Sequence, residues 1–197
     1  EDPVSRKPSV IVMRGNLAPE GSILKVGDAG SKQREFRGKA LVFASQEAAL
    51  EALKAGRLVP GTVAVLSGMG CRGGPGMALA SGFVSAVDGA GLSTTVAVIT
   101  DGQLSGLNRG IAIGQVAPEA ALGGPIGLVR DGDAIAIDMA AHRVTLEVSE
   151  AELESRRATG EPHRPADERG WLNIYARVVQ PITRGAVLVA PEADTKP

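Results

Sequence analysis

Residues 40–66 have the sequence ALVFASQEAALEALKAGRLVPGTVAVL, and this stretch decides the fold class. The apolar run over residues 40–43 predicts a strand. Ser45 then offers a side-chain cap for a helix over residues 46–55, which Gly56 would end. A second apolar run over residues 62–66 predicts another strand. Strands that alternate with a helix in this way favour an α/β fold.

The same alternation continues on both sides of this stretch. Further strands are predicted over residues 10–13, 23–26, 96–100, 111–116, 126–129, 134–138, 144–148 and 185–189. Further helices are predicted over residues 78–90, from a capping box at Ser149 to about residue 157, and over residues 171–179. Residues 14–19 are predicted as a loop, and turns over 131–133 and 140–143 suggest hairpins. This strand-rich order with several helices indicates an α/β fold or a barrel flanked by helices.

The length of 197 residues suits one compact domain. We expect residues 1–8 to be an arm or linker remnant, residues 9–190 to be the domain, and residues 191–197 to be a disordered tail. Hydrophobic residues make up 44% of the chain and aromatic residues only 3%, so the core must be mostly aliphatic. The single cysteine, Cys71, excludes an internal disulfide and a cluster held by several thiolates of this chain, and a cytoplasmic location fits.

Charge and hydropathy exclude several classes of function. The net charge of −1 gives no electrostatic footprint for nucleic acid. No apolar run approaches the roughly 20 residues of a membrane span, and no segment resembles a signal peptide. Arg156, Arg157 and Arg164 lie near acidic residues, so we interpret them as a solvated face. His142 and His163 lie in polar, turn-like settings and are expected at the surface.

The most unusual segment is GMGCRGGPGM at residues 68–77. Its five glycines allow backbone N–H groups to approach a ligand closely, and its position before a helix is typical of an anion site. A tight structural turn would use the same residues. The segment lacks the ending of a nucleotide P-loop and the spacing of a dinucleotide fingerprint. Cys71 within it is interpreted as a small buried thiol.

A second segment, TDGQLSGLNRG at residues 100–110, follows a predicted buried strand. Ser105 lies between turns there and could be presented as a nucleophile or a base. On the local pattern alone, a serine that caps a turn is the alternative. A hydrolase elbow would carry glycine two residues before the serine, and Gln103 stands there, so a hydrolase is disfavoured.

Taken together, these segments resemble the C-terminal domain of the dihydroxy-acid dehydratase and phosphogluconate dehydratase family. The matching stretches are RGNLAP at 14–19, GGPGM at 73–77, TDGxxSG at 100–106, PEA at 118–120, GGPI at 123–126, DGD at 131–133 and RGWL at 169–172. Each stretch is short, but seven in the right order cover nearly the whole chain.

The resemblance implies a β-barrel-like swivelling domain flanked by helices, similar to the C-terminal domain of aconitases. It also implies a hydro-lyase in which Ser105 removes a proton as an alkoxide held by nearby cations. An iron–sulfur cluster and a magnesium ion would belong to an N-terminal domain or subunit outside this chain, and a homo-oligomer is expected. The residues expected at the substrate are Gly74, Pro75, Gly76, Gln103 and Asn108.

Three positions depart from the family pattern. Gln103 stands where arginine is usual, Leu79 where a glutamate serves the magnesium site, and Leu107 where some members carry a hydroxyl. Two functions therefore remain open. The chain is the C-terminal part of a hydro-lyase that converts a dihydroxy acid or sugar acid to a 2-keto acid, or it is a non-catalytic regulatory, assembly or small-molecule binding domain.

Either function predicts the behaviour of the isolated chain. We expect it to bind neither the iron–sulfur cluster nor magnesium tightly and to lack dehydratase activity. We also expect the face that carries residues 73–77 and 105–109 to be exposed and inclined to self-associate.

Overall fold

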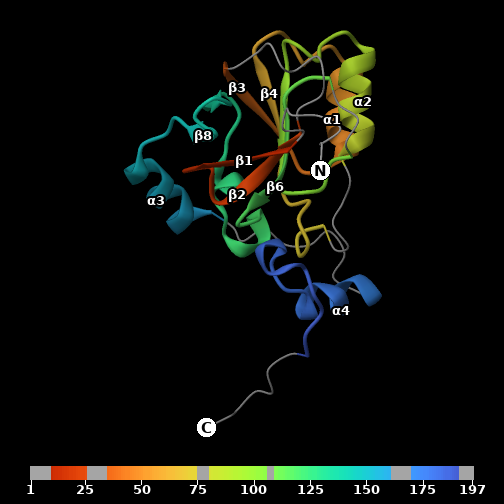
Figure 1. The fold of residues 1–197 in the computed structure, drawn as a ribbon, viewed down its shortest axis with the longest axis vertical. Coiled ribbons are helices and arrows are strands. Elements are labelled where there is room, and N and C mark those ends of the chain that lie inside the picture. The colour runs from red at the N-terminus through yellow and green to blue at the C-terminus, as the bar shows by residue number, and fades with distance from the viewer. Residues whose placement is uncertain (1–9, 26–34, 75–79, 106–108, 161–169, 191–197) are drawn as a thin grey trace, which may run out of the picture.

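A closed barrel of eight strands dominates the computed structural model, which describes residues 10–25, 35–74, 80–105, 109–160 and 170–190 (Figure 1). The strands follow one another around the barrel in the order β1 (Val10–Gly15), β2 (Ala18–Lys25), β6 (Ala112–Ala117), β5 (Ala97–Thr100), β4 (Thr62–Leu66), β3 (Glu35–Phe43), β7 (Ala134–Asp138) and β8 (Arg143–Leu146). The expected α/β barrel is therefore confirmed, whereas its likeness to the aconitase domain stays a prediction.

Four neighbouring strands, β3, β4, β5 and β6, are parallel, and most of the remaining pairs are antiparallel. The parallel strands are connected by α1 (Gln46–Lys54) and α2 (Ser81–Gly89), which lie together against one side of the barrel (Figure 1). Leu66 pairs with Thr100 at the last position of β4 and β5. The segments that follow these two strands therefore start side by side.

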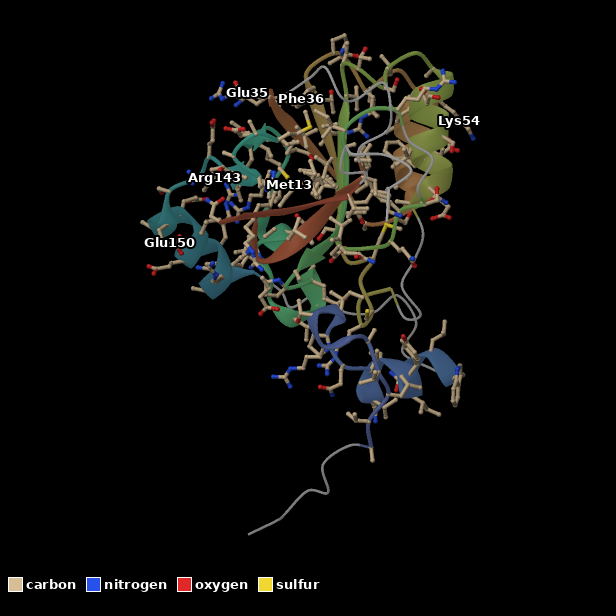
Figure 2. All side chains as sticks on the ribbon, viewed as in Figure 1. Met13, Glu35, Phe36, Lys54, Arg143 and Glu150 are labelled. Atoms are coloured by element: carbon tan, nitrogen blue, oxygen red, sulfur yellow. The ribbon has the colours of Figure 1, made fainter. Side chains whose placement is uncertain are left out.

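Two apolar clusters hold the fold together. One fills the barrel, where Met13 lies (Figure 2), and consists almost wholly of aliphatic residues. The other lies between the parallel strands and the two helices and includes Phe43 and Phe83, whose ring centroids are 6.4 Å apart. All five residues of β4 are buried because this strand contributes to both clusters. The aliphatic composition predicts this arrangement well.

Helix α3 (Glu150–Thr159) lies on the opposite side of the barrel from α1 and α2 (Figure 1). Ser149 caps it by accepting a hydrogen bond from the backbone N–H of Glu152, as the capping box predicts. Arg156 of this helix is buried and pairs with Asp133 at 2.6 Å. The prediction of a solvated face is therefore wrong for Arg156, holds for the exposed Arg157, and for Arg164 falls outside the described residues.

The last described elements are α4 (Trp171–Val178) and the 3-10 helix η4 (Ile182–Arg184), beyond one end of the barrel (Figure 1). Helix α4 has no fully buried side chain, and Trp171, Leu172 and Ile174 are exposed. Among the described residues, no helix is long and apolar enough to cross a membrane.

Three predicted elements are wrong. Residues 14–19 belong mostly to a β1–β2 hairpin, in which the Asn16 side chain bonds both backbone groups of Leu146 and fixes the turn. Residues 126–129 are not a strand, because Pro125 begins the 3-10 helix η3 (Pro125–Leu128). Residues 185–189 make one bridge only, since Gly185 and the residue after it have positive φ angles. The predicted arm and tail lie outside the described residues.

Candidate functional site

The candidate site lies at the carboxyl edge of the parallel strands. β4 leads into the glycine-rich loop, β5 into the segment that carries Ser105, and β6 into residues 118–124. Ligands of parallel α/β sheets commonly bind at this edge, because the connecting loops of neighbouring strands meet there. The two segments singled out in the sequence are therefore neighbours in space.

Asp101 holds the first part of the glycine-rich loop. Its side chain is 1% exposed, and its carboxylate accepts hydrogen bonds from three backbone N–H groups. Oδ1 accepts from Met69 at 2.8 Å, while Oδ2 accepts from Gly68 at 3.1 Å and from Ala120 at 2.9 Å. One carboxylate thus joins the segments that follow three of the four parallel strands, β4, β5 and β6.

Glu119 holds the second part of the loop. It is 4% exposed and accepts from the backbone N–H of Arg72 at 3.0 Å and of Gly73 at 3.2 Å. A side chain at Gly70 would collide with this carboxylate, so glycine is required there. The described part of the loop therefore surrounds carboxylates of the chain itself, while a ligand anion at this loop stays a prediction. Four of its amides donate to these two carboxylates, which agrees with the structural alternative.

Burial raises the pKa of the Asp101 carboxyl, although its backbone N–H partners oppose the shift. Burial also raises the pKa of Glu119, with a further contribution from the nearby Asp101 charge. Cys71 is 1% exposed, and its pKa is raised by burial and by Glu119, so the thiol form is favoured. This confirms the interpretation of Cys71 as a small buried thiol.

The C-terminal segment is attached to the same loop. The Arg72 guanidinium donates two hydrogen bonds to the carbonyl of Val179, at 3.1 and 3.2 Å. The pKa of Tyr175 on α4 is raised by burial and by its interactions with Cys71 and Glu119. Helix α4 therefore lies against the glycine-rich loop.

The segment after Asp101 folds back along the outside of β6. The Gly102 carbonyl accepts from the backbone N–H of Gln115 at 2.8 Å, and Leu104 is buried in the cluster beneath the helices. Ser105 is exposed, and its backbone N–H donates to Ser81 Oγ at 2.8 Å. It thus lies at the first residue of α2, where the helix dipole favours negative charge.

Two more contacts hold this segment. The carbonyl of Gln103 accepts from the backbone N–H of Ala80 at 3.2 Å, and the carbonyl of Leu104 accepts from Lys25 Nζ at 2.7 Å. Lys25 is the last residue of β2, so it lies far from Ser105 in the sequence. The serine therefore has helix α2 on one side and a lysine ammonium close to its preceding peptide.

The structure describes only some of the predicted site residues. The Gln103 side chain is exposed. Gly74 is half-buried, and its backbone N–H donates a hydrogen bond to the Gly70 carbonyl. The other predicted or divergent site positions lie outside the described residues: Pro75, Gly76, Leu79, Leu107 and Asn108. The residues that follow the glycine-rich motif, 80 and 81, contact residues 103–105, which joins the two segments.

The sequence alone does not reveal the contacts that Asp101, Glu119, Lys25 and Ser81 make at the candidate site. The signal for the two acids is an acidic side chain close after an apolar, buried strand. Lys25 and Ser81 carry no local signal, because only the fold brings them to residues 104 and 105.

The described residues do not fit a metal site. No group of three His, Cys, Asp or Glu side chains among them could hold an ion. Asp101 and Glu119 already accept backbone hydrogen bonds, and the single thiol of the chain cannot hold an iron–sulfur cluster. The part of the chain that the structure describes therefore offers an exposed serine at the start of α2, but no metal centre.

Comparisons with known proteins identify the family of the chain. A family model described as dihydroxy-acid/6-phosphogluconate dehydratase C-terminal matches residues 1–186. The dihydroxy-acid dehydratase of Aquifex aeolicus is 42% identical over 190 residues, and that of Roseiflexus castenholzii is 44% identical over 191 residues. These matches cover 96% and 97% of this chain but 34% of each relative, so the chain spans about a third of their length. The chain belongs to the family of dihydroxy-acid and 6-phosphogluconate dehydratase C-terminal domains.

Proposed function

We propose that this chain is the C-terminal part of a hydro-lyase that converts a dihydroxy acid or sugar acid to a 2-keto acid, with Ser105 as the base. The family match over residues 1–186 carries the proposal, since the relatives are named dihydroxy-acid dehydratases. The exposed position of Ser105 at the first residue of α2 supports its role, because a base must reach the substrate.

Ser105 would act as an alkoxide, because a neutral hydroxyl is too weak a base for a carbon-bound proton. The proton beside the carboxylate moves to the serine oxygen, and the hydroxyl group on the next carbon leaves. The departing hydroxide takes a proton back, which forms water and restores the alkoxide. The enol that remains becomes the 2-keto acid by tautomerisation.

The other half of the site would come from an N-terminal domain or subunit. The chain spans 34% of the length of its relatives, and its described residues hold no metal site. We propose that this partner brings the iron–sulfur cluster and the magnesium ion, and that the substrate lies between the two parts. Gly74, Pro75, Gly76, Gln103 and Asn108 would then contact the hydroxy acid.

The test uses the chain together with the cluster-bearing part encoded with it, and measures release of 2-keto acid from a panel of sugar acids and branched dihydroxy acids. Ser105→Ala should nearly abolish turnover. The matched control is Ser155→Ala on α3, an exposed serine far from the site, which should keep full turnover. Turnover that survives Ser105→Ala would remove this residue from the mechanism.

We propose the non-catalytic alternative on Leu79 and Gln103, which stand where the family usually carries a glutamate and an arginine. It predicts that no cluster-bearing partner exists and that the chain binds a small molecule or assembles with other proteins. The neighbouring coding sequence distinguishes the two proposals. An adjacent segment with three well-placed cysteines favours the hydro-lyase, and the lack of such a segment favours the binding domain.

A further inference from the structure

We propose that Lys25 is a positioning residue for Ser105: it fixes the peptide before the serine and supplies a positive charge that favours an ionised side chain at position 105. The inference rests on the proposed role of Ser105, since only a base gains from such a charge. Its test nevertheless needs no turnover.

The geometry places the ammonium close to the serine. Lys25 Nζ lies 2.7 Å from the carbonyl oxygen of Leu104, which belongs to the peptide bond that joins residues 104 and 105. Standard bond lengths then keep Nζ within about 8 Å of the Ser105 hydroxyl, whatever the serine rotamer. A charge at this range acts on the ionisation of a side chain without touching it.

Two contacts fix the position of residues 104 and 105 relative to Lys25. The Leu104 side chain is 5% exposed and anchored in the apolar cluster beneath the helices. On the other side, the Ser105 N–H donates to Ser81 Oγ. The short peptide between these two anchors therefore keeps a fixed distance to the lysine ammonium.

Another cation of the region points elsewhere. Arg109 follows Ser105 by four residues, but its guanidinium pairs with Asp88 at the far end of α2, at 3.7 Å. Lys25, in contrast, directs its ammonium to the peptide next to the serine. Among the described residues, the side-chain charge that favours an anion at position 105 is therefore assigned to the lysine, in addition to the N-terminus of α2.

The experiment replaces the serine with a titratable probe. In a Cys71→Ala background, Ser105→Cys introduces the only thiol, whose pKa follows from the ultraviolet absorbance of the thiolate and from the pH dependence of alkylation by iodoacetamide. We expect this pKa to lie about one unit below the free-cysteine value of about 8.5, because an opposite charge nearby favours the thiolate. Below that pKa, one unit gives about tenfold faster alkylation.

Three lysine variants in this background test the cause. Lys25→Met should raise the pKa toward the ordinary value, with only the contribution of the α2 N-terminus left, whereas Lys25→Arg should keep it low because the charge is retained. The matched control is Lys54→Met on α1, an exposed lysine that points away from the barrel and should change nothing (Figure 2). Equal pKa values in the Lys25→Met and Lys54→Met proteins would overturn the proposal, and so would loss of the shift in Lys25→Arg.

A salt series decides the question if Lys25→Met does not fold. In the protein that keeps the lysine, raising the ionic strength from about 0.01 to about 1 M shortens the Debye length from about 30 to about 3 Å and should raise the thiol pKa. A pKa that does not respond to salt would overturn the inference. Failure of either arm leaves the Ser105→Ala turnover test unaffected, so the two proposals fail separately.

Discussion

Replacing Asp101 by asparagine tests whether one buried carboxylate organises the candidate site. The substitution keeps the shape of the side chain but removes the charge and turns one acceptor into a donor. In the folded chain both carboxylate oxygens accept backbone N–H groups, from Met69 on one side and from Gly68 and Ala120 on the other. An asparagine cannot serve all three donors.

The magnitude follows from this count. If the amide oxygen takes the Oδ2 position, the bonds to Gly68 and Ala120 survive as neutral hydrogen bonds, and the new NH₂ group faces the N–H of Met69. A buried donor without an acceptor costs about 1–3 kcal/mol, and the loss of charge weakens the other two bonds by up to about 1 kcal/mol each. Burial of Asp101, which raises its pKa, offsets part of this loss. We expect Asp101→Asn to lower the free energy of unfolding by about 2–4 kcal/mol.

Urea unfolding at neutral pH, followed by circular dichroism, measures the change. The matched control is Asp131→Asn, because exposed Asp131 accepts, among the residues that the structure describes, only the Val42 N–H, through one oxygen that asparagine can replace. The control should lose less than about 0.5 kcal/mol. Equal losses in the two variants would refute the argument that Asp101 joins three strand ends. A thermal shift of about 5–15 °C should accompany the larger loss.

Three further predictions concern charge and the C-terminal helix. Burial raises the pKa of Glu119, so its contribution to the free energy of unfolding falls as the pH rises from the ordinary carboxyl range through the raised pKa. The free energy of unfolding of the native chain minus that of Glu119→Gln, measured in urea, should therefore be larger at about pH 4.5 than at about pH 7.5. A difference that stays constant with pH would contradict this prediction. Arg156→Ala should lose about 3–5 kcal/mol in the same assay because it leaves the Asp133 carboxylate, only 11% exposed, without its cation. Exposed Arg157→Ala should lose at most about 1 kcal/mol, and similar losses in the two variants would contradict the burial argument. Trp171 is 69% exposed beside other apolar residues of α4, so Trp171→Asp should reduce concentration-dependent association in sedimentation velocity. The control Val59→Asp, at an exposed residue outside α4, should leave association unchanged. Association that Trp171→Asp does not change would exclude the exposed face of α4 as the contact.

Sequence predicts the fold best where burial is uniform. The strand over residues 62–66 has the predicted bounds because all its side chains are buried, and Ser45 caps α1 as its position predicts. The hairpin at 14–19 was missed because Gly15 and Pro19 are loop signals. In the structure the register of β1 shifts beside Gly15, and an amide side chain replaces part of the ladder. Turn signals inside a bulged strand cannot be distinguished locally from a loop.

The sequence predicts the two segments of the candidate site but not the contacts that bring them together. The glycine-rich loop and Ser105 were both identified from composition and position. That the loop encloses carboxylates of its own chain follows from strand order, which brings Asp101 and Glu119 to the same edge. The face that carries residues 73–77 and 105–109 is expected to be exposed, and most of it lies outside the described residues. Among the described residues, exposed large apolar side chains gather on α4 and at Val187–Val189.

The contacts that hold the glycine-rich loop in place, called here the frame of the site, are independent of the residues proposed for its chemistry. Asp101, Glu119 and Gly70 fix the loop through backbone contacts that involve none of the three positions at which the chain departs from the family pattern. The frame therefore persists whether the domain catalyses or only binds. A chain whose frame is stable in unfolding assays, but whose position 105 has no shifted ionisation, would have kept the architecture of a dehydratase and lost its base. A shifted ionisation that depends on Lys25 would instead show that the electrostatics of proton removal survive the changes at residues 79, 103 and 107.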